Sequence, residues 1–344
     1  MKNWIKADDN YNVVLSSRIR LARNLREIPF PDKLSEETGK DIVKNIEDAF
    51  YSSSYTEENY KSKYLWMNEE LTNRAYYEKH LISHKLLGNY KKSAFILDND
   101  EVVSIMLNEE DHIRLQCITS GFNLDETYDL ANKLDNLLEE KLDYAFDEKL
   151  GYLTACPTNI GTGLRASVML HLPALSMNNE MVRILNVVGQ VGMTIRGLFG
   201  EGSKAEGDLY QISNQVTLGL SEEEIINNLK AVVAQIIDRE QWSRQQLMKG
   251  YKYELQDKVY RSLGVLRSAV LLNSEECLNL ISNVRMGVEM GIIKDVDVQV
   301  LNSLLVETQP ATLQLISNAK LSEKDRDFSR AKLLRKSLGG NDLD

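Results

Sequence analysis

Short apolar runs separated by turn residues dominate the first part of the chain. Residues 94–97 and 102–107 are apolar, and the polar triplet 98–100 between them is typical of a turn. Residues 113–119 form another apolar run with partial alternation. Consecutive strands of this kind predict an antiparallel meander, because antiparallel neighbours need only short connections. Further strands are predicted at 151–155 and 167–172.

Apolar residues at helical spacing predict helices between these strands and throughout the last third of the chain. The clearest examples in the first part are residues 42–50 and 130–142. Ser221 and Glu224 form a capping box that begins a longer helix. More helices are predicted at 250–269, 274–290, 297–307, 311–319 and 322–337, with Ser274 as another N-cap.

Length and pattern together divide the chain into two domains. At about 100–200 residues per domain, 344 residues suffice for two or three domains. We expect an α+β domain at residues 1–220, with an antiparallel sheet flanked by helices, and an all-α domain at residues 221–344. Hydrophobic residues make up 43% of the chain and charged residues 27%, which excludes a disordered or collagen-like protein.

Charge, cysteines and hydropathy restrict the partners and the compartment. The formal net charge of -10 disfavours sequence-independent binding of nucleic acid, although it permits a local basic site. The three cysteines, Cys117, Cys156 and Cys277, do not suit a disulfide framework and indicate a reducing compartment. The chain has no apolar run of about 18 residues and no apolar core of a signal peptide. We therefore expect a soluble, cytoplasmic protein with no membrane partner.

Two arginines alternate with apolar residues in the segment 14–24. If this segment is a strand, Arg18 and Arg20 point to one face, and Ile19 and Leu21 point to the other. Two guanidinium groups on one face suit an anion, because their planar donors bind phosphate oxygens bidentately. A solvated strand face has the same spacing, so the spacing leaves both interpretations open.

Acidic residues gather in the segment Asn108-Glu-Glu-Asp-His112, which Arg114 follows between two apolar runs. A polar hairpin turn would explain this composition. The functional interpretation is a carboxylate that orients or deprotonates a substrate. A metal site fits less well, because the four histidines show no ligand spacing such as HExxH.

Two glycine-marked segments carry further candidate chemistry. Cys156 follows a predicted strand, Thr158 could donate a hydrogen bond to its sulfur, and nearby arginines would lower its pKa toward the thiolate. An inert cysteine is the alternative. Residues 194–207 contain four glycines and the acid Glu201, without Walker A or Rossmann spacing. This segment is either a loop that brings a carboxylate over a substrate or a plain surface loop.

Five arginines stand beside strand ends or turns, accompanied by two carboxylates and a cysteine. The arginines are Arg18, Arg20, Arg114, Arg165 and Arg196. This set matches phosphoryl transfer, in which electrostatics and positioning carry nearly all of the catalysis.

Four motifs in this order resemble those of the phosphagen kinase superfamily, and they cover about residues 14–220. They are Ser-Ser-Arg-Ile-Arg-Leu-Ala-Arg-Asn at 16–24, Asn-Glu-Glu-Asp-His-Ile-Arg at 108–114, Cys-Pro-Thr-Asn-Ile-Gly-Thr at 156–162 and Arg-Gly-x-x-Gly-Glu at 196–201. The resemblance implies ATP as the phosphoryl donor, with Mg²⁺, and the five arginines as a clamp on the nucleotide phosphates. It implies that Glu110 and Glu201 hold the acceptor guanidinium with Cys156 beside it, and that His80 lies near the adenine. No protein ligand for a metal follows from it.

Departures from the family pattern point to one of its branches. The first motif starts at Ser16, so the helical front domain of phosphagen kinases is expected to be missing, and a helical domain follows instead. This order resembles the bacterial protein-arginine kinases, in which an open acceptor site admits a polypeptide. Met169 replaces a second adenine-side histidine, and Gly202 and Lys204 alter the loop after Glu201.

The last predicted helix contains Arg326-Asp-Phe-Ser-Arg-Ala331. Arg326 and Arg330 are four residues apart on one helical face, with Asp327 beside them. An ordinary charged helix face has the same spacing. The segment resembles the RDxxRP-type motif with which the protein-arginine kinases bind phosphoarginine, although Ala331 stands in place of proline. There the arginines would hold the phosphate, and the aspartate would hold the guanidinium.

The resemblance implies transfer of the ATP γ-phosphoryl group to arginine side chains of proteins, with Glu110 favoured as the base. It also implies a zinc-binding activator protein and delivery of the marked proteins to a Clp ATPase and protease in a stress response. Apolar stripes on the predicted C-terminal helices favour self-association, so we expect a homodimer. Two alternatives remain. One is a kinase of a free guanidino compound, and the other is a non-catalytic phosphoarginine-binding adaptor.

Overall fold

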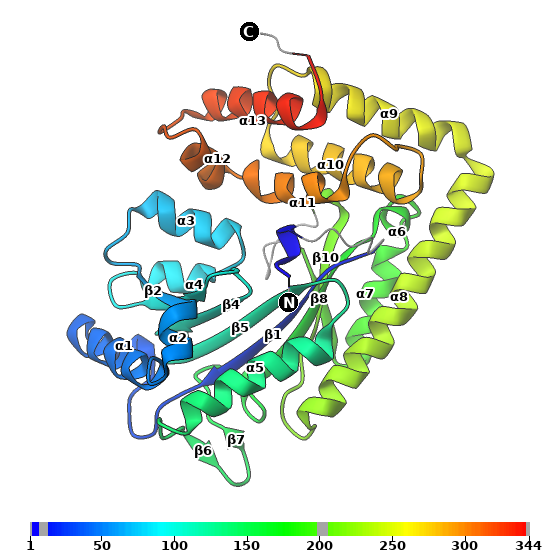
Figure 1. Ribbon diagram of the computed structural model, residues 1–344. Coiled ribbons are helices and arrows are strands. Elements are labelled where there is room, and N and C mark those ends of the chain that lie inside the picture. Colours follow the sequence, from blue (N-terminus) through cyan, green and yellow to red (C-terminus); the bar gives the residue numbers. More distant parts are fainter. Residues whose placement is uncertain (1, 7–12, 198–205, 342–344) are drawn as a thin grey trace.

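An antiparallel sheet of eight strands organises the first part of the chain (Figure 1). The computed structural model describes residues 2–6, 13–197 and 206–341. In their order across the sheet, the strands are β2 (Tyr60–Tyr64), β3 (Ala94–Asp98), β4 (Val103–Leu107), β5 (Ile113–Ser120), β1 (Val14–Arg23), β8 (Leu164–His171), β10 (Leu209–Asn214) and β9 (Met193–Arg196). All neighbouring pairs are antiparallel. A separate pair joins β6 (Phe146–Asp147) to β7 (Gly151–Tyr152).

Helices surround this sheet and make up the last third of the chain (Figure 1). The first part contains α1 (Glu36–Phe50), α2 (Ser54–Asn59), α3 (Glu70–Glu78), α4 (His84–Gly88), α5 (Leu124–Glu139), α6 (Pro173–Met177) and α7 (Met181–Gln190). After the sheet come α8 (Glu222–Gly250), α9 (Lys252–Ser268), α10 (Ser274–Glu289), α11 (Val298–Glu307), α12 (Pro310–Ile316) and α13 (Glu323–Leu338). Short 3-10 turns are η1 (Trp4–Lys6), η2 (Pro31–Lys33), η3 (Pro157–Asn159) and η4 (Glu206–Asp208). Among the described residues, no helix combines the length and the apolar character needed to cross a membrane.

The two faces of β1 differ in polarity. Ile19 and Leu21 are buried in the main core, which also contains side chains of α1, α5 and α8. Because side chains alternate along a strand, Arg18 and Arg20 point to the opposite face. The central strand of the sheet therefore separates the core from a surface that carries positive charge.

Helices α3 and α4 cover the neighbouring strands on the face that carries the arginines. Met106 on β4 lies directly opposite Arg114 on β5, and it packs with Phe95 in a small apolar cluster. Leu86 of α4 and Leu81, which precedes α4, complete this cluster. The arginine-bearing strands are thus left open beside a wall formed by α3 and α4.

Most elements predicted from the sequence are confirmed within a few residues. The meander is β3, β4 and β5, and the capping box of Ser221 and Glu224 begins α8. Ser274 as an N-cap was wrong, because the Asn273 side chain accepts the hydrogen bond from the Glu276 amide and Ser274 is the first helical residue.

The strand predicted at 151–155 is also shorter than expected. Only Gly151 and Tyr152 pair as a strand. The amide of Ala155 instead donates to the carboxylate of Asp111, which draws the segment away from the two-stranded pair.

Helix α8 spans two hydrophobic cores. Its first half contributes Leu229 and Val233 to the core under the sheet. Its last turns contribute Leu247 to a second core, which consists mainly of residues from α9 to α13. The predicted division near residue 220 falls just before this shared helix and stays a prediction.

A buried ionic network joins the sheet to the helical part. Glu289 on α10 accepts hydrogen bonds from Arg285 Nε at 2.7 Å and Arg244 Nη1 at 2.8 Å, and it lies 3.5 Å from His171 Nδ1 at the end of β8. Although burial by itself raises the pKa of Glu289, Arg285 and its other cationic neighbours lower it to about 2. Arg244 also pairs with Glu240, whose carboxylate caps the first amides of α6.

Removing the central carboxylate of this network should destabilise the fold. Glu289→Ala leaves the buried Arg285 without its carboxylate partner, so we expect the free energy of unfolding to fall by about 3–5 kcal/mol. Urea unfolding of the whole chain measures this change. Asp295→Ala is the control, because it breaks the exposed ion pair with Arg267 and should leave the midpoint nearly unchanged. Equal, small effects of the two variants would contradict the structural role of the network.

Candidate active site

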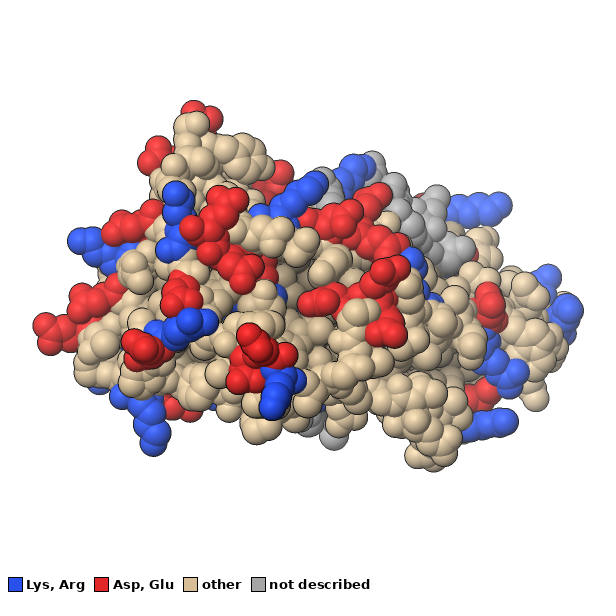
Figure 2. Space-filling model, turned by 90° about the horizontal axis from the view of Figure 1, so that it is seen from below, with Lys and Arg blue, Asp and Glu red and all other residues tan. Residues whose placement is uncertain are grey.

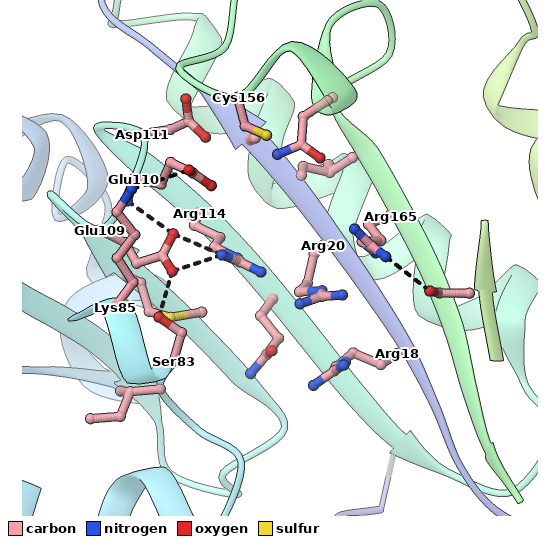
Figure 3. Close-up of a pocket in the computed structure, with 18 of the residues that line it drawn as sticks. Arg18, Arg20, Ser83, Lys85, Glu109, Glu110, Asp111, Arg114, Cys156 and Arg165 are labelled. Atoms are coloured by element: carbon pink, nitrogen blue, oxygen red, sulfur yellow. Dashed lines mark hydrogen bonds and ion pairs between the residues drawn. The ribbon is translucent and has the colours of Figure 1, made fainter. Parts of the chain in front are cut away.

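A cavity of about 520 Å³ opens on the arginine-bearing face of the sheet (Figure 3). Strands β1, β5, β8, β9 and β10 contribute its floor, and its sides come from residues between 77 and 85, 109–111 and 156–159. Eight predicted site residues line it together: Arg18, Arg20, His80, Glu110, Arg114, Cys156, Arg165 and Arg196. Glu201, Gly202 and Lys204 lie outside the described residues.

The strand register gathers arginines that are far apart in the sequence. Arg20 on β1 lies directly opposite Arg165 on β8. Arg114 on β5 lies opposite Ala22, so its side chain shares the face of Arg20. Like charges placed directly opposite each other destabilise a sheet. The cluster therefore suits a bound polyanion, whose charge would offset this repulsion.

Burial and neighbouring charges lower the pKa values of two of these arginines. Burial, followed by the charges of Arg114, Arg165 and Arg196, lowers the pKa of Arg18 to about 9. Burial and then Arg18 lower the pKa of Arg20 as well. Arg20 Nε is buried and forms no hydrogen bond with any described residue, so a donor is available for an anionic oxygen. Because arginine stays cationic at neutral pH, these shifts mean that the site favours an incoming negative charge.

Glu109 is a site residue that the sequence analysis missed. Both of its carboxylate oxygens accept a hydrogen bond from Arg114 Nη1 at 2.7 Å, and Ser83 Oγ donates to it at 2.5 Å. Burial alone would raise the pKa of Glu109, but Arg114 and the hydrogen bonds lower it to about 2. Glu109 therefore fixes the orientation of Arg114. Adjacent residues in a turn point in different directions. The pair Glu109 and Glu110 could therefore have indicated that one glutamate binds an arginine while the other stays accessible.

Glu110, the predicted base, points into the cavity and already holds a cation. Its Oε1 lies 3.1 Å from Nζ of Lys85, which belongs to α4 (Figure 3). The side chain of Glu110 is 26% exposed, in contrast to that of Glu109 at 2%. A carboxylate that holds a cation beside a cluster of arginines can hold a cationic acceptor next to an anionic donor. Sequence reasoning missed Lys85, since no pattern links residue 85 to residue 110.

Asp111 connects the acidic turn to the cysteine segment. Its Oδ1 accepts hydrogen bonds from the Ala155 amide at 2.7 Å and from Asn24 Nδ2 at 2.6 Å. This places Cys156 at the cavity, where its sulfur lies 3.0 Å from Thr158 Oγ1. The predicted contact between Cys156 and Thr158 is therefore confirmed, whereas the thiolate form of Cys156 stays a prediction.

His80 stands at the other end of the cavity beside a small apolar space. Trp4, Ile118 and Met169 line this space with His80, and the rings of Trp4 and His80 are 5.9 Å apart. Burial and the charge of Arg18 lower the pKa of His80 to about 3, so its imidazole is neutral at physiological pH. A flat aromatic ligand part would find stacking partners here. The sequence analysis did not single out Trp4.

The C-terminal motif makes contacts within the protein. The side chain of Arg330 is 1% exposed and donates to the carbonyl oxygens of Thr308 at 2.8 Å and Leu272 at 2.6 Å. Its Nη1 also pairs with Asp327, while Arg326 Nη1 donates to the Leu321 carbonyl. These bonds tie α13 to the end of α11 and to the segment before α10. Phosphoarginine binding by this motif stays a prediction, and α13 lies beyond α10 and α11 as seen from the sheet (Figure 1).

The outer surface differs in charge from the cavity. On the face shown in Figure 2, acidic side chains predominate and are interspersed with basic ones. The net charge of -10 is therefore compatible with a cavity whose floor is strongly basic. The basic lining of the cavity focuses the field that attracts an anionic ligand.

The arginine cluster should bind a polyphosphate at some cost in stability. We expect Arg20→Met to weaken binding of inorganic tripolyphosphate at least about tenfold, because a hydrogen bond to a charged group contributes about 1.5–3 kcal/mol. The same variant should match or exceed the parent protein in its unfolding midpoint, since it removes a buried, repelled charge. Isothermal titration calorimetry and thermal unfolding measure the two effects, with the exposed Arg261→Met as the control. Loss of stability without loss of binding would contradict the anion-binding role.

Comparisons with known proteins agree with this geometry. The family model described as "ATP:guanido phosphotransferase, C-terminal catalytic domain" matches residues 41–243, and the "Protein-arginine kinase McsB C-terminal domain" model matches residues 252–343. Among solved structures, that of a lombricine kinase aligns with a TM-score of 0.58 at 28% identity and covers 69% of this chain and 68% of that one. A taurocyamine kinase from Schistosoma mansoni shares the fold with a TM-score of 0.61 at 24% identity, covering 78% of this chain and 41% of that one.

Curated relatives match over the whole length of the chain. A protein-arginine kinase from Clostridium kluyveri is 65% identical over 343 residues, which cover 99% of each chain. One from Clostridium tetani is 59% identical over 98% of this chain and 99% of the relative, and one from Caldanaerobacter subterraneus is 47% identical over 95% and 97%. The matches therefore cover both the sheet-containing part and the helical part of the chain. The chain belongs to the ATP:guanido phosphotransferase family and, within it, to the protein-arginine kinases.

Proposed function

We propose that this protein transfers the γ-phosphoryl group of ATP to the guanidinium group of arginine side chains in polypeptides. One observation carries the proposal: the Glu110 carboxylate, which holds the cation of Lys85, opens into the same cavity as five arginines. An acceptor cation and a donor polyanion can therefore meet in one place. The relatives that match over nearly the whole chain are protein-arginine kinases, which supports arginine in a protein as the acceptor.

The nucleotide would lie across the strands. Arg18, Arg20, Arg165 and Arg196 would bind the phosphate oxygens, with Arg114 held in place by Glu109. The base would extend toward His80 and Trp4. With the base at His80, the γ-phosphate would point toward Glu110. The acidic turn 109–111 lies on the far side of the arginine cluster from Arg18 (Figure 3). Preorganised donors of this kind stabilise the charge on the transferring group.

The chemical step requires a deprotonated guanidinium nitrogen. The pKa of an arginine guanidinium lies above 12, so the free group is a poor nucleophile. Glu110 would orient one nitrogen in line with the γ-phosphorus and accept its proton as the N–P bond forms. The bond from the γ-phosphorus to the bridging oxygen breaks, and ADP leaves with that electron pair. Glu201 as a second holder of the guanidinium and Cys156 as its electrostatic neighbour belong to the same proposal.

Mg²⁺ fits this site as a companion of the nucleotide. The described residues contain no group of three or more metal-binding His, Cys, Asp or Glu side chains. Mg²⁺ is commonly held by substrate phosphates and water with few protein ligands. A nucleotide bound by the arginines would bring these phosphate oxygens into the cavity. When bound, the ion would neutralise charge on the β- and γ-phosphates.

The wider role of the enzyme is part of the same proposal and is supported by the resemblance of the sequence motifs. We infer a cytoplasmic enzyme that acts as a homodimer in a stress response and marks proteins for a Clp ATPase and protease, with a zinc-binding activator protein. Phosphoarginine binding at Arg326, Asp327 and Arg330 would couple the product to the helical domain.

A change of one functional group at Glu110 tests the mechanism. Glu110→Gln keeps the shape of the side chain but cannot accept the proton, so we expect turnover to fall by about 10²–10⁴-fold. The affinity for ATP should remain, because the arginines are unchanged. Mass spectrometry of casein after incubation with ATP measures the gain of phosphoryl groups on arginine, and calorimetry measures ATP binding. Full activity of Glu110→Gln would refute the role of this carboxylate, and casein without phosphoarginine after reaction with the parent enzyme would refute the function.

A further inference from the structure

A second cavity of about 1000 Å³ opens between the sheet-containing part and the helical part. One wall consists of residues from 65 to 78 and of α4, and the other consists of Gln309 and Pro310 at the start of α12. Glu78, the last residue of α3, holds the walls together, because its carboxylate accepts hydrogen bonds from the amides of Ala311 and Thr312 at 2.8 and 2.7 Å. We call this cavity the interdomain cleft.

The interdomain cleft adjoins the catalytic cavity. Tyr77 and His84 line both of them. His84 is the first residue of α4, and Leu87 and Gly88 of the same helix line the cleft. Helix α4 therefore stands between the acceptor carboxylate and the cleft, and both spaces lie along this one short helix.

Lys85 shows how far a basic side chain reaches from the backbone of α4 toward Glu110. Its backbone lies in α4, next to His84, and its Nζ lies 3.1 Å from Glu110 Oε1. An arginine side chain is about as long as a lysine side chain. A polypeptide whose backbone passes beside α4 could therefore place its arginine at Glu110 in exchange for Lys85, which is 40% exposed and has a second carboxylate, Asp32, 3.7 Å from its Nζ.

The size of the catalytic cavity also directs the polypeptide to the cleft. About 520 Å³ is the usual size of a site for one small ligand, and here it must hold a nucleotide and a guanidinium. The residues before and after the acceptor arginine must then lie outside it. The interdomain cleft is the neighbouring space large enough to receive them.

The lining of the interdomain cleft suits an apolar side chain. Tyr77, Leu87, Tyr90 and Pro310 supply apolar and aromatic surface, and Tyr90 is 48% exposed. Its charged and amide groups are mostly engaged within the protein. Glu70 pairs with Arg74, Glu78 binds the start of α12, and the amides of Asn68 and Asn73 bond to each other.

We propose that the interdomain cleft binds the polypeptide residues that flank the acceptor arginine, with a preference for an apolar side chain. This proposal rests on the function proposed above and adds to it where the substrate lies. Because Gln309 and Pro310 belong to the helical domain, the two domains build the polypeptide specificity together.

Filling the cleft tests this proposal without disturbing the catalytic residues. Gly88 lines the cleft at the end of α4, and a Cβ atom added there meets no atom within 4 Å. We expect Gly88→Trp to raise the KM of a nine-residue peptide with leucine and phenylalanine beside its arginine by at least about tenfold, as expected for the lost burial of an apolar side chain. The KM of ATP should stay unchanged. Gly88→Glu should shift the preference toward a peptide with lysine at the flanking positions.

Gly264→Trp is the matched control, since this glycine is also helical and open but lies on α9 away from both cavities. A thermal unfolding midpoint equal to that of the parent establishes that each variant is folded. Parental peptide KM in Gly88→Trp, or an equal rise in the KM of ATP, would overturn the cleft as the flank site while leaving the kinase function standing. Failure of the parent enzyme to phosphorylate either peptide or casein on arginine would instead overturn the proposed function.

Discussion

The repulsion among the arginines on the central strands is the constraint on which the rest of the structure depends. Arg18 and Arg20 come from the middle of the sheet, and Arg165 lies directly across from Arg20. An edge strand would let such side chains turn away into water, but strand β1 has a neighbour on each side. Burial, together with the charges of Arg114, Arg165 and Arg196, lowers the pKa of Arg18 to about 9. The fold thus holds these charges in a place where a bound anion would relieve their repulsion.

Stabilisation of this arrangement comes from the opposite face and from the edges of the cavity. Ile19 and Leu21 of the same strand lie in the main core, so the apolar face of β1 offsets the strain of its charged face. Glu109 neutralises Arg114 and keeps it in one orientation. Function and stability are therefore divided between the two sides of one strand, and the alternation of a strand makes this division possible.

Two carboxylates attach the helical part to the sheet-containing part beside the site. Glu289 binds arginines of α8 and α10 next to the end of β8, and Glu78 binds the start of α12. Each of these carboxylates loses water on burial and gains hydrogen bonds within the protein instead. Each therefore requires accurate positioning of the sheet-containing part and the helical part. The interdomain cleft exists because these links hold the helical domain beside α3 and α4 without filling the space between them. If the cleft binds the polypeptide as proposed, both parts of the chain build the acceptor side of the enzyme.

The sequence by itself determined the local structure and the chemistry of the site. The meander, the capping box before α8 and the helices after it follow from short-range patterns, and the alternation at Arg18 and Arg20 indicated their common face. The motifs predicted that the arginines and Glu110 belong to one phosphoryl-transfer site, and the structure gathers them around one cavity. Such conclusions depend on neighbours along the chain or on residue types, and both are visible in the sequence.

Only the tertiary structure decided which groups meet across long separations. It paired Glu109 with Arg114 and Ser83, placed Lys85 on Glu110, and buried Arg330 among backbone carbonyls, although its spacing suggested an exposed pair. It also formed the cleft between α4 and α12. These contacts arise from strand register and domain packing, which no local periodicity encodes, because the partners approach only after the sheet and the helices have packed.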